Sequence, residues 1–252
     1  MSESTRVDAE SLAAPTTKTV DPVTTEQVHS PARNTTVQLV TIRPRGFEGK
    51  LQVCLALHGR GATAQVYLDL GVPAMLDAVV AAGVPPFAVV AMDGGSDSYW
   101  VAKDKSDDPQ RMLTEDLPTW LGNRGFATLP FAALGISMGS YGALNYARNP
   151  GLSSVAAISS ALFESWTDAK SRNVFADEAT WEATEPLRHI DEIRPVQLGV
   201  WCGLSDPFIN QSRQLVDRAR PRIAAIGTGA HDDAYWRRVL PEALRFVGET
   251  LP

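Results

Sequence analysis

Short apolar runs alternate with longer helical patterns along most of this chain, and this alternation restricts the possible folds more than any other feature. The first long run, residues 51–57, is apolar at every position except Gln52, as expected for a strand covered on both faces. A half-buried alternating strand precedes it at 37–42, and further strand-length runs follow at 87–92, 131–136, 155–159, 198–202 and 222–226. Helical patterns lie between or after these runs, at 73–82, 109–121, 138–148, 207–218 and 233–246. Strand–helix alternation at this spacing predicts an α/β fold with a mainly parallel sheet flanked by helices on both faces.

Residues 1–36 differ in composition from the rest of the chain. They contain no aromatic residue, are rich in threonine and carry Pro15, Pro22 and Pro31. Such a segment buries too little apolar surface to offset the entropy that is lost on ordering. We therefore predict a flexible N-terminal tail at 1–36 and one α/β domain at 37–252. No basic segment followed by an apolar one is visible, so the expected location is cytoplasmic; the alternative is an exported protein whose signal is missing from this sequence.

The charge balance is mildly acidic. Lys and Arg number 23 against 29 Asp and Glu, which gives a net charge of −6, and no cationic block is present. Phosphate binding needs clustered cations, so we exclude a nucleic-acid partner. No apolar run approaches the ~20 residues that span a bilayer, so no transmembrane segment is expected. Cys54 and Cys202 lie in apolar runs without CxxC spacing and are expected to be core residues, not a disulfide or metal site.

The strongest functional signal is the segment GISMG at 135–139. GxSxG patterns also arise by chance, but this one directly follows a strand run and directly precedes a helical pattern, as in a nucleophile elbow. In such an elbow the serine takes a strained turn conformation that lifts its hydroxyl above the sheet. The two glycines leave room where side chains would collide with neighbouring backbone. Ser137 is therefore the predicted nucleophile, and an incidental serine in a Gly-rich turn is the alternative.

A serine hydroxyl needs a base at neutral pH, and the chain offers four histidines. His29 lies in the predicted tail, and His189 lies in a polar stretch at 161–195 that interrupts the strand–helix rhythm and is expected to pass over the sheet edge. His231 follows the last predicted strand in the loop GTGAHDD, the position at which open α/β sheets place their sites. His231 is therefore the predicted base, and a solvated loop histidine is the alternative.

The base needs an orienting carboxylate, for which Asp206 is the candidate. It follows the strand run at 198–202 and precedes a helical pattern, and it gives the chain order serine–aspartate–histidine that is typical of α/β-hydrolases. Asp206 could instead only cap that helix. Asp232, Asp233 and Glu192 are the competing acids, although neighbours in sequence do not easily fold back onto the His231 ring.

Two backbone N–H groups should form an oxyanion hole. One belongs to Met138, directly after the nucleophile, and the other to Arg60 in the loop HGRG after an early strand. The Arg60 side chain could in addition attract a carboxylate or phosphate of the substrate, or could simply lie on the surface. The loop DGGSDSYW at 93–100 follows another strand, and we predict substrate contacts for its Tyr99 and Trp100 and for His58 of the HGRG loop.

Together these segments resemble the putative-esterase branch of the α/β-hydrolase superfamily, which includes S-formylglutathione hydrolases, feruloyl and siderophore esterases and mycolyltransferases. The resemblance covers about residues 30–247, is strongest to actinobacterial members, and is carried by CLALHGRG (54–61), AVVAMDGGSDSYW (88–100), ALGISMGSYGAL (133–144), CGLSDPF (202–208) and GAHDDAYWRRVLPEALRF (229–246). It implies the roles given above for Ser137, Asp206, His231, Arg60 and Met138, and it implies neither a metal nor an organic cofactor. The family often has a second glycine after the elbow, where this chain has Ser140.

Three functions are compatible with this sequence. The first is a serine esterase that hydrolyses small carboxylic esters through an acyl-enzyme. The second is an acyltransferase of the mycolyltransferase kind, in which a sugar or glycerol hydroxyl replaces water. The third is a non-catalytic binding protein on the same fold, which a complete triad argues against. The sequence indicates no oligomeric state.

Overall fold

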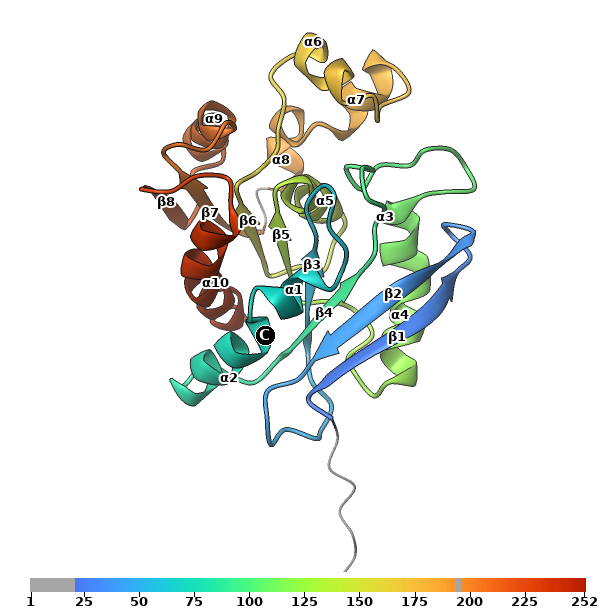
Figure 1. Cartoon of the computed structure of the whole chain (residues 1–252), viewed down its shortest axis with the longest axis vertical. Coiled ribbons are helices and arrows are strands. Elements are labelled where there is room, and N and C mark those ends of the chain that lie inside the picture. The colour runs from blue at the N-terminus through green and yellow to red at the C-terminus, as the bar shows by residue number, and fades with distance from the viewer. Residues whose placement is uncertain (1–20, 194–195) are drawn as a thin grey trace, which may run out of the picture.

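In the computed structural model, which describes residues 21–193 and 196–252, eight strands form one twisted sheet with helices on both sides (Figure 1). The strand order is β1-β2-β4-β3-β5-β6-β7-β8. Pairing is antiparallel for β1 with β2 and for β2 with β4, and parallel from β4 to β8. The strands are β1 (Val23–Ser30), β2 (Thr35–Ile42), β3 (Val53–Leu57), β4 (Ala88–Met92), β5 (Ala132–Ile136), β6 (Ser154–Ile158), β7 (Gln197–Gly203) and β8 (Ile223–Gly227).

The central strands β3 to β6 are buried along their whole length because helices cover both faces of the sheet. Alternate residues of β3 show the two sides: Leu55 packs in one core cluster, and Cys54 and Ala56 pack in the other. One face is covered by α1 (Val66–Asp69), α2 (Val72–Ala81) and α10 (Asp233–Gly248). The opposite face is covered by α3 (Pro109–Arg111), the π-helical turn η1 (Met112–Asp116), α4 (Leu117–Asn123), α5 (Met138–Tyr146) and α9 (Ile209–Ala219). The predicted α/β architecture is confirmed.

The polar stretch that interrupts the rhythm forms a small helical excursion between β6 and β7, the gold and orange segment at the top of Figure 1. Its aromatic rings of Phe163 and Phe175 pack on Tyr99, so the excursion stands over the end of the sheet that carries the functional loops. Its elements are α6 (Trp166–Ala169), η2 (Lys170–Arg172), α7 (Glu178–Thr184), η3 (Pro186–Arg188) and α8 (Ile190–Ile193).

The prediction of a tail up to residue 36 is wrong for residues 21–36. Val23–Ser30 forms the edge strand β1, which pairs with β2 over its whole length. The Ser30 hydroxyl also donates to the Asp116 carboxylate at 2.6 Å. An edge strand is half exposed, so it needs little apolar surface and obtains its order from backbone pairing with its neighbour. Residues 1–20, the remainder of the predicted tail, lie outside the described residues.

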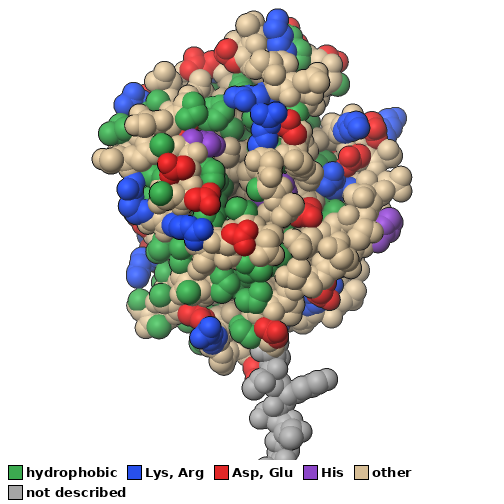
Figure 2. Space-filling model, in the orientation of Figure 1, with side chains coloured by type: hydrophobic (Ala, Val, Ile, Leu, Met, Phe, Trp, Pro, Cys, Tyr) green, Lys and Arg blue, Asp and Glu red, His purple; other side chains and the backbone are tan. Residues whose placement is uncertain are grey.

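Cys54 and Cys202 are buried free thiols, as expected. In the two described ranges, no helix combines the length and the apolar composition that crossing a membrane requires. The space-filling view shows acidic and basic side chains interspersed over the visible face (Figure 2).

Candidate active site

Ser137 occupies a strained turn between β5 and α5, with φ 57° and ψ −119°. Both neighbouring glycines are required by close backbone packing. A Cβ on Gly139 would lie within 1.8 Å of the Leu57 carbonyl oxygen, and one on Gly135 within 2.2 Å of the Gly139 carbonyl oxygen. The glycines leave these positions free of side chains, and the GISMG segment can therefore pack against the end of β3. The serine side chain remains accessible to a cavity at this end of the sheet.

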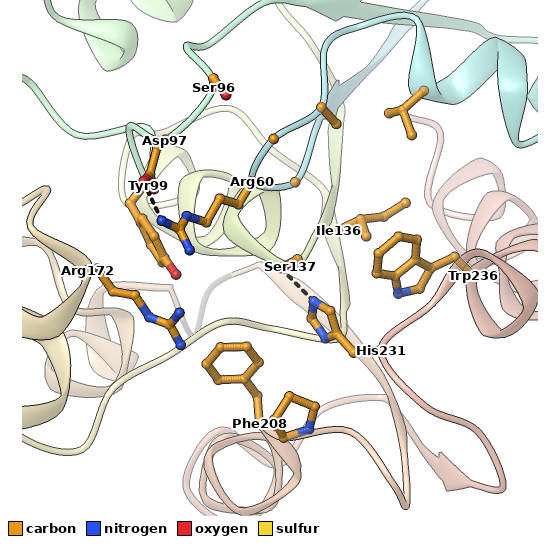
Figure 3. A pocket seen from close by; sticks show the side chains of 15 residues that line it. Arg60, Ser96, Asp97, Tyr99, Ile136, Ser137, Arg172, Phe208, His231 and Trp236 are labelled. Carbon is orange, nitrogen blue, oxygen red and sulfur yellow. Dashed lines mark hydrogen bonds and ion pairs between the residues drawn. The ribbon is translucent and has the colours of Figure 1, made fainter.

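His231, in the loop between β8 and α10, reaches Ser137 directly. Its Nε2 lies 2.9 Å from the Ser137 hydroxyl oxygen (Figure 3). Its Nδ1 lies 2.9 Å from Oδ2 of Asp206. An ionised carboxylate only accepts hydrogen bonds, so this network assigns the ring proton to Nδ1 and leaves Nε2 as the acceptor for the serine hydroxyl. The three side chains therefore form one continuous hydrogen-bonded chain.

Asp206 lies behind the His231 imidazole, and its side chain is fully buried. Burial raises the pKa of this carboxyl, but hydrogen bonds from His231 and from the Phe208 N–H outweigh it, so the pKa lies below its ordinary value. The Phe208 N–H donates to Oδ1 at 2.8 Å. Since α9 begins at Ile209 with Phe208 at its N-cap position, Asp206 does not cap that helix.

The competing carboxylates make other contacts. Asp232 caps α10 by accepting the Tyr235 N–H at 2.8 Å. Asp233 faces Arg237 one turn along the same helix. Glu192 pairs with Arg148 at 2.6 Å, on the excursion. None of these three carboxylates is a hydrogen-bond partner of the His231 ring, within the part of the chain that is described.

Two backbone N–H groups are available next to Ser137 for an oxyanion. Met138 is the first residue of α5, so its N–H has no acceptor within the helix. Arg60 follows Gly59, whose Cβ position is 3.4 Å from the Ser137 Cβ, so the HGRG loop lies against the elbow. Among the described residues, the Arg60 N–H donates to no main-chain carbonyl. Both candidates from the sequence thus remain suited to this role.

A cavity of about 630 Å³ opens above Ser137. Tyr99 lines it, as predicted, and so do three residues that sequence reasoning did not assign: Arg172, Phe208 and Trp236. The other lining residues are Gly59, Arg60, Gly61, Ala62, Val66, Ser96, Asp97, Ile136, Ser137, Pro207 and His231. Among the described residues, no group of three or more His, Cys, Asp or Glu side chains is arranged to hold a metal ion.

Phe208 and Trp236 enclose the His231 imidazole. Their ring centroids lie 5.5 and 5.3 Å from that of the histidine. The Trp236 indole N–H donates to the Ser159 hydroxyl at 3.1 Å, which fixes the indole orientation. Phe208 belongs to the segment CGLSDPF and Trp236 to GAHDDAYW, so their closeness in sequence to Asp206 and His231 was the signal that could have found them.

The predicted substrate contacts of His58 and Trp100 are wrong, because both side chains are buried away from this cavity. His58 Nε2 accepts the Gly94 N–H at 2.9 Å, and its Nδ1–H donates to the Gly59 carbonyl at 2.8 Å. Burial lowers the pKa of His58, which favours this neutral form. Both residues support the functional loops from inside the core.

The side chain of Arg60 forms an ion pair at the cavity. Its guanidinium pairs with the Asp97 carboxylate at 2.7 Å, across the cavity rim. The pair is about half exposed, so it adds little to stability. The two opposite charges cancel each other locally.

A family model described as "Putative esterase" matches residues 30–247. The chain belongs to this family. It is an esterase-type protein with the α/β-hydrolase fold.

Solved esterase structures share the fold at low sequence identity. A ferulic acid esterase is 22% identical with a TM-score of 0.76, over 91% of this chain and 98% of that one. An S-formylglutathione hydrolase from Staphylococcus aureus is 16% identical with a TM-score of 0.71, over 90% and 98%. MPT51 from Mycobacterium tuberculosis is 19% identical with a TM-score of 0.70, over 92% and 100%. A search of curated proteins finds no match to this esterase.

Proposed function

We propose that this esterase hydrolyses small carboxylic esters through a covalent acyl-enzyme on Ser137, with His231 as the general base and Asp206 as the carboxylate that orients it. The observation that carries the proposal is the pair of 2.9 Å hydrogen bonds on the two nitrogens of His231. The bond to Asp206 keeps the ring proton on Nδ1, and the bond to Ser137 places the basic Nε2 next to the nucleophile.

Acylation begins when the Ser137 oxygen attacks the ester carbonyl carbon and passes its proton to Nε2 of His231. The resulting oxyanion accepts hydrogen bonds from the N–H groups of Met138 and Arg60. The tetrahedral intermediate then breaks its carbon–oxygen bond to the alcohol, which leaves with the proton from Nε2. Asp206 stays ionised throughout and stabilises the imidazolium form.

Deacylation repeats these steps with water as the nucleophile. His231 takes a proton from water, the hydroxide adds to the acyl carbon, and the bond to Ser137 breaks as the serine recovers its proton. The acid is released and the enzyme returns to its starting state. No cofactor enters this scheme.

A fluorophosphonate probe tests the nucleophile, because it reacts only with an activated serine. We expect wild type to be labelled and to hydrolyse 4-nitrophenyl acetate, and Ser137→Ala to lose labelling and at least about 10³-fold in kcat/KM. Ser96→Ala, which removes another hydroxyl from the cavity wall, is the matched control and should keep both. Absence of labelling in wild type would favour the non-catalytic alternative.

The acyl acceptor is tested by product analysis. With glycerol or trehalose present, we expect free acid as the main product. A transferred ester as the main product would replace hydrolysis by acyl transfer while leaving the role of Ser137 intact.

A further inference from the structure

Arg172 places a guanidinium on the wall of the catalytic cavity, opposite His231 (Figure 3). It is the last residue of η2 in the excursion, and its side chain points into the space that Ser137 faces. Its guanidinium carbon lies 5.6 Å from the ring centroids of both Phe163 and Phe208. Two aromatic rings at this distance hold a guanidinium through cation–π attraction and restrict its position.

The Arg172 guanidinium lacks a carboxylate partner within the described chain. Its Nε is buried and has no hydrogen-bond partner there. This N–H lies within the protein, whereas the end of the guanidinium points into the cavity (Figure 3). A guanidinium that faces a cavity without a carboxylate partner is available to an anionic group of a bound molecule.

The other charges around the cavity do not compensate Arg172. Asp97 is the only carboxylate among the lining residues, and Arg60 already pairs with it at 2.7 Å. Asp206 is fully buried behind the imidazole, and its oxygens accept hydrogen bonds from His231 and Phe208. The cavity thus carries one positive charge that no neighbouring side chain of the described residues offsets.

We propose that Arg172 binds an anionic group of the substrate, and that this esterase prefers esters that carry a carboxylate away from the ester bond. The inference rests on the proposed function. A guanidinium offers parallel N–H donors in a plane, which fits a carboxylate in a bidentate geometry. The Tyr99 side chain points toward Arg172 in the same view and offers a hydroxyl beside it (Figure 3). The carboxylate can belong to the acid or to the alcohol part of the ester.

Two pairs of substrates test whether the carboxylate belongs to the acid part or to the alcohol part of the ester. In the first pair the acyl part ends in a carboxylate or its neutral amide: the 4-nitrophenyl monoester of adipic acid and the corresponding adipamic ester. In the second pair the alcohol part carries the difference: 4-acetoxybenzoate and 4-acetoxybenzamide. The quantity compared is the ratio of kcat/KM for the charged and the neutral member of each pair, so that intrinsic ester reactivity cancels between variants.

We expect Arg172→Met to lower this ratio about 10- to 100-fold in at least one pair, and Arg172→Lys to lower it less. Arg188→Met is the matched control, because it removes a cation that stacks on Trp181 in the same excursion and does not line the cavity. Its ratios should equal those of wild type. In wild type, added salt should lower kcat/KM for the charged member of that pair more than for the neutral one. This second test needs no variant.

Equal ratios in wild type and Arg172→Met for both pairs, with no salt effect specific to the charged ester, would overturn the proposal. The same holds if Arg188→Met lowers the ratio as much as Arg172→Met does. Failure of the proposed function gives a different result: wild type would then hydrolyse neither member of either pair and would not react with a fluorophosphonate.

Discussion

The indole N–H of Trp100 donates to the main-chain carbonyl of His58 at 3.1 Å, deep in the core and out of reach of the substrate cavity. His58 in turn accepts the Gly94 N–H at 2.9 Å, so the loops that follow β3 and β4 are joined twice. Trp100 adopts a left-handed backbone conformation, with φ 57°, which is unusual for a large side chain and is held by these contacts. This cross-bracing fixes the position of the loop that carries the Arg60 N–H.

Removal of this hydrogen bond should lower activity more than its effect on stability explains. Trp100→Phe leaves the His58 carbonyl without its partner, and we expect a loss of about 1–3 kcal/mol in the free energy of unfolding. We also expect kcat to fall about 10- to 100-fold with a smaller change in KM, because a displaced oxyanion donor weakens transition-state binding.

Trp201→Phe is the control for this effect. It removes an equally buried indole whose N–H donates to Glu242 at 3.1 Å, on the α10 side of the sheet. It should lose similar stability and keep kcat. Equal kcat in the two variants would show that the bond from Trp100 serves stability alone.

A second pair of variants separates an aspartate that orients His231 from an aspartate that only caps a helix. Asp206→Asn should lower kcat about 10⁴-fold, since an amide no longer enforces the tautomer that leaves Nε2 free, as in the serine-protease case. Asp232→Asn alters the N-cap of α10, next to His231 in sequence, and should cost at most about 1 kcal/mol of stability while keeping kcat near that of wild type. Similar kcat values in the two variants would remove Asp206 from the proposed triad.

The sequence predicted the fold and the closeness of Ser137, Asp206 and His231 because local rules determine their positions. Each of the three follows a strand whose carboxyl end lies at one edge of the sheet, so the pattern of apolar runs places them together. Gly135 is required by its contact with Gly139, four residues away, which a short motif can record, whereas Gly139 is required by its contact with Leu57 at the end of β3.

Features that depend on distant parts of the chain could not be predicted in this way. His58 and Trp100 look like pocket residues in sequence because they follow strands, and only their packing against each other places them in the core. Arg172 lies in the excursion, where no periodicity exists, and its approach to Phe208 joins segments separated by β7. Such contacts are set by tertiary packing, about which composition and spacing carry no information.

The edge strand β1 allows a direct test of the largest error in the prediction from sequence, the tail at residues 21–36. Composition alone predicts that loss of residues 1–30 costs little, whereas the structure places eight paired residues of β1 there. We expect deletion of 1–30 to lower Tm by at least about 5 °C, since it removes these backbone bonds, the Ser30–Asp116 contact and the cover of β2. Deletion of 1–20, which leaves β1 whole, is the control. Equal Tm values for the two deletions would contradict the role of β1.

Glu185 gives this esterase an expected pH dependence of stability. Its side chain is fully buried in the excursion, where it accepts the Phe163 N–H at 3.2 Å and the Trp181 indole N–H at 3.1 Å. Burial raises the pKa of Glu185 to about 8, in spite of these hydrogen bonds, so its carboxyl holds a proton in the folded state at neutral pH. In the unfolded chain a glutamate releases that proton near pH ~4.3.

The sign of the effect follows from this difference in bound protons. Between about pH 4.3 and pH 8 the folded state holds a proton that the unfolded state has lost, so stability is highest at the acidic end and falls as the pH rises. The slope from this one group is at most about 1.4 kcal/mol per pH unit. Glu185→Gln cannot ionise and should flatten the dependence by up to that amount, whatever its absolute stability.

Urea unfolding at several pH values between about 5 and 8 measures these slopes. Glu182→Gln is the matched control, because Glu182 is half exposed on α7, the helix that Glu185 directly follows, and pairs with Arg188. Its slope should follow wild type. Parallel curves for wild type and Glu185→Gln would mean that the buried carboxyl is already ionised at neutral pH, held in that form by its N–H donors and by Arg188.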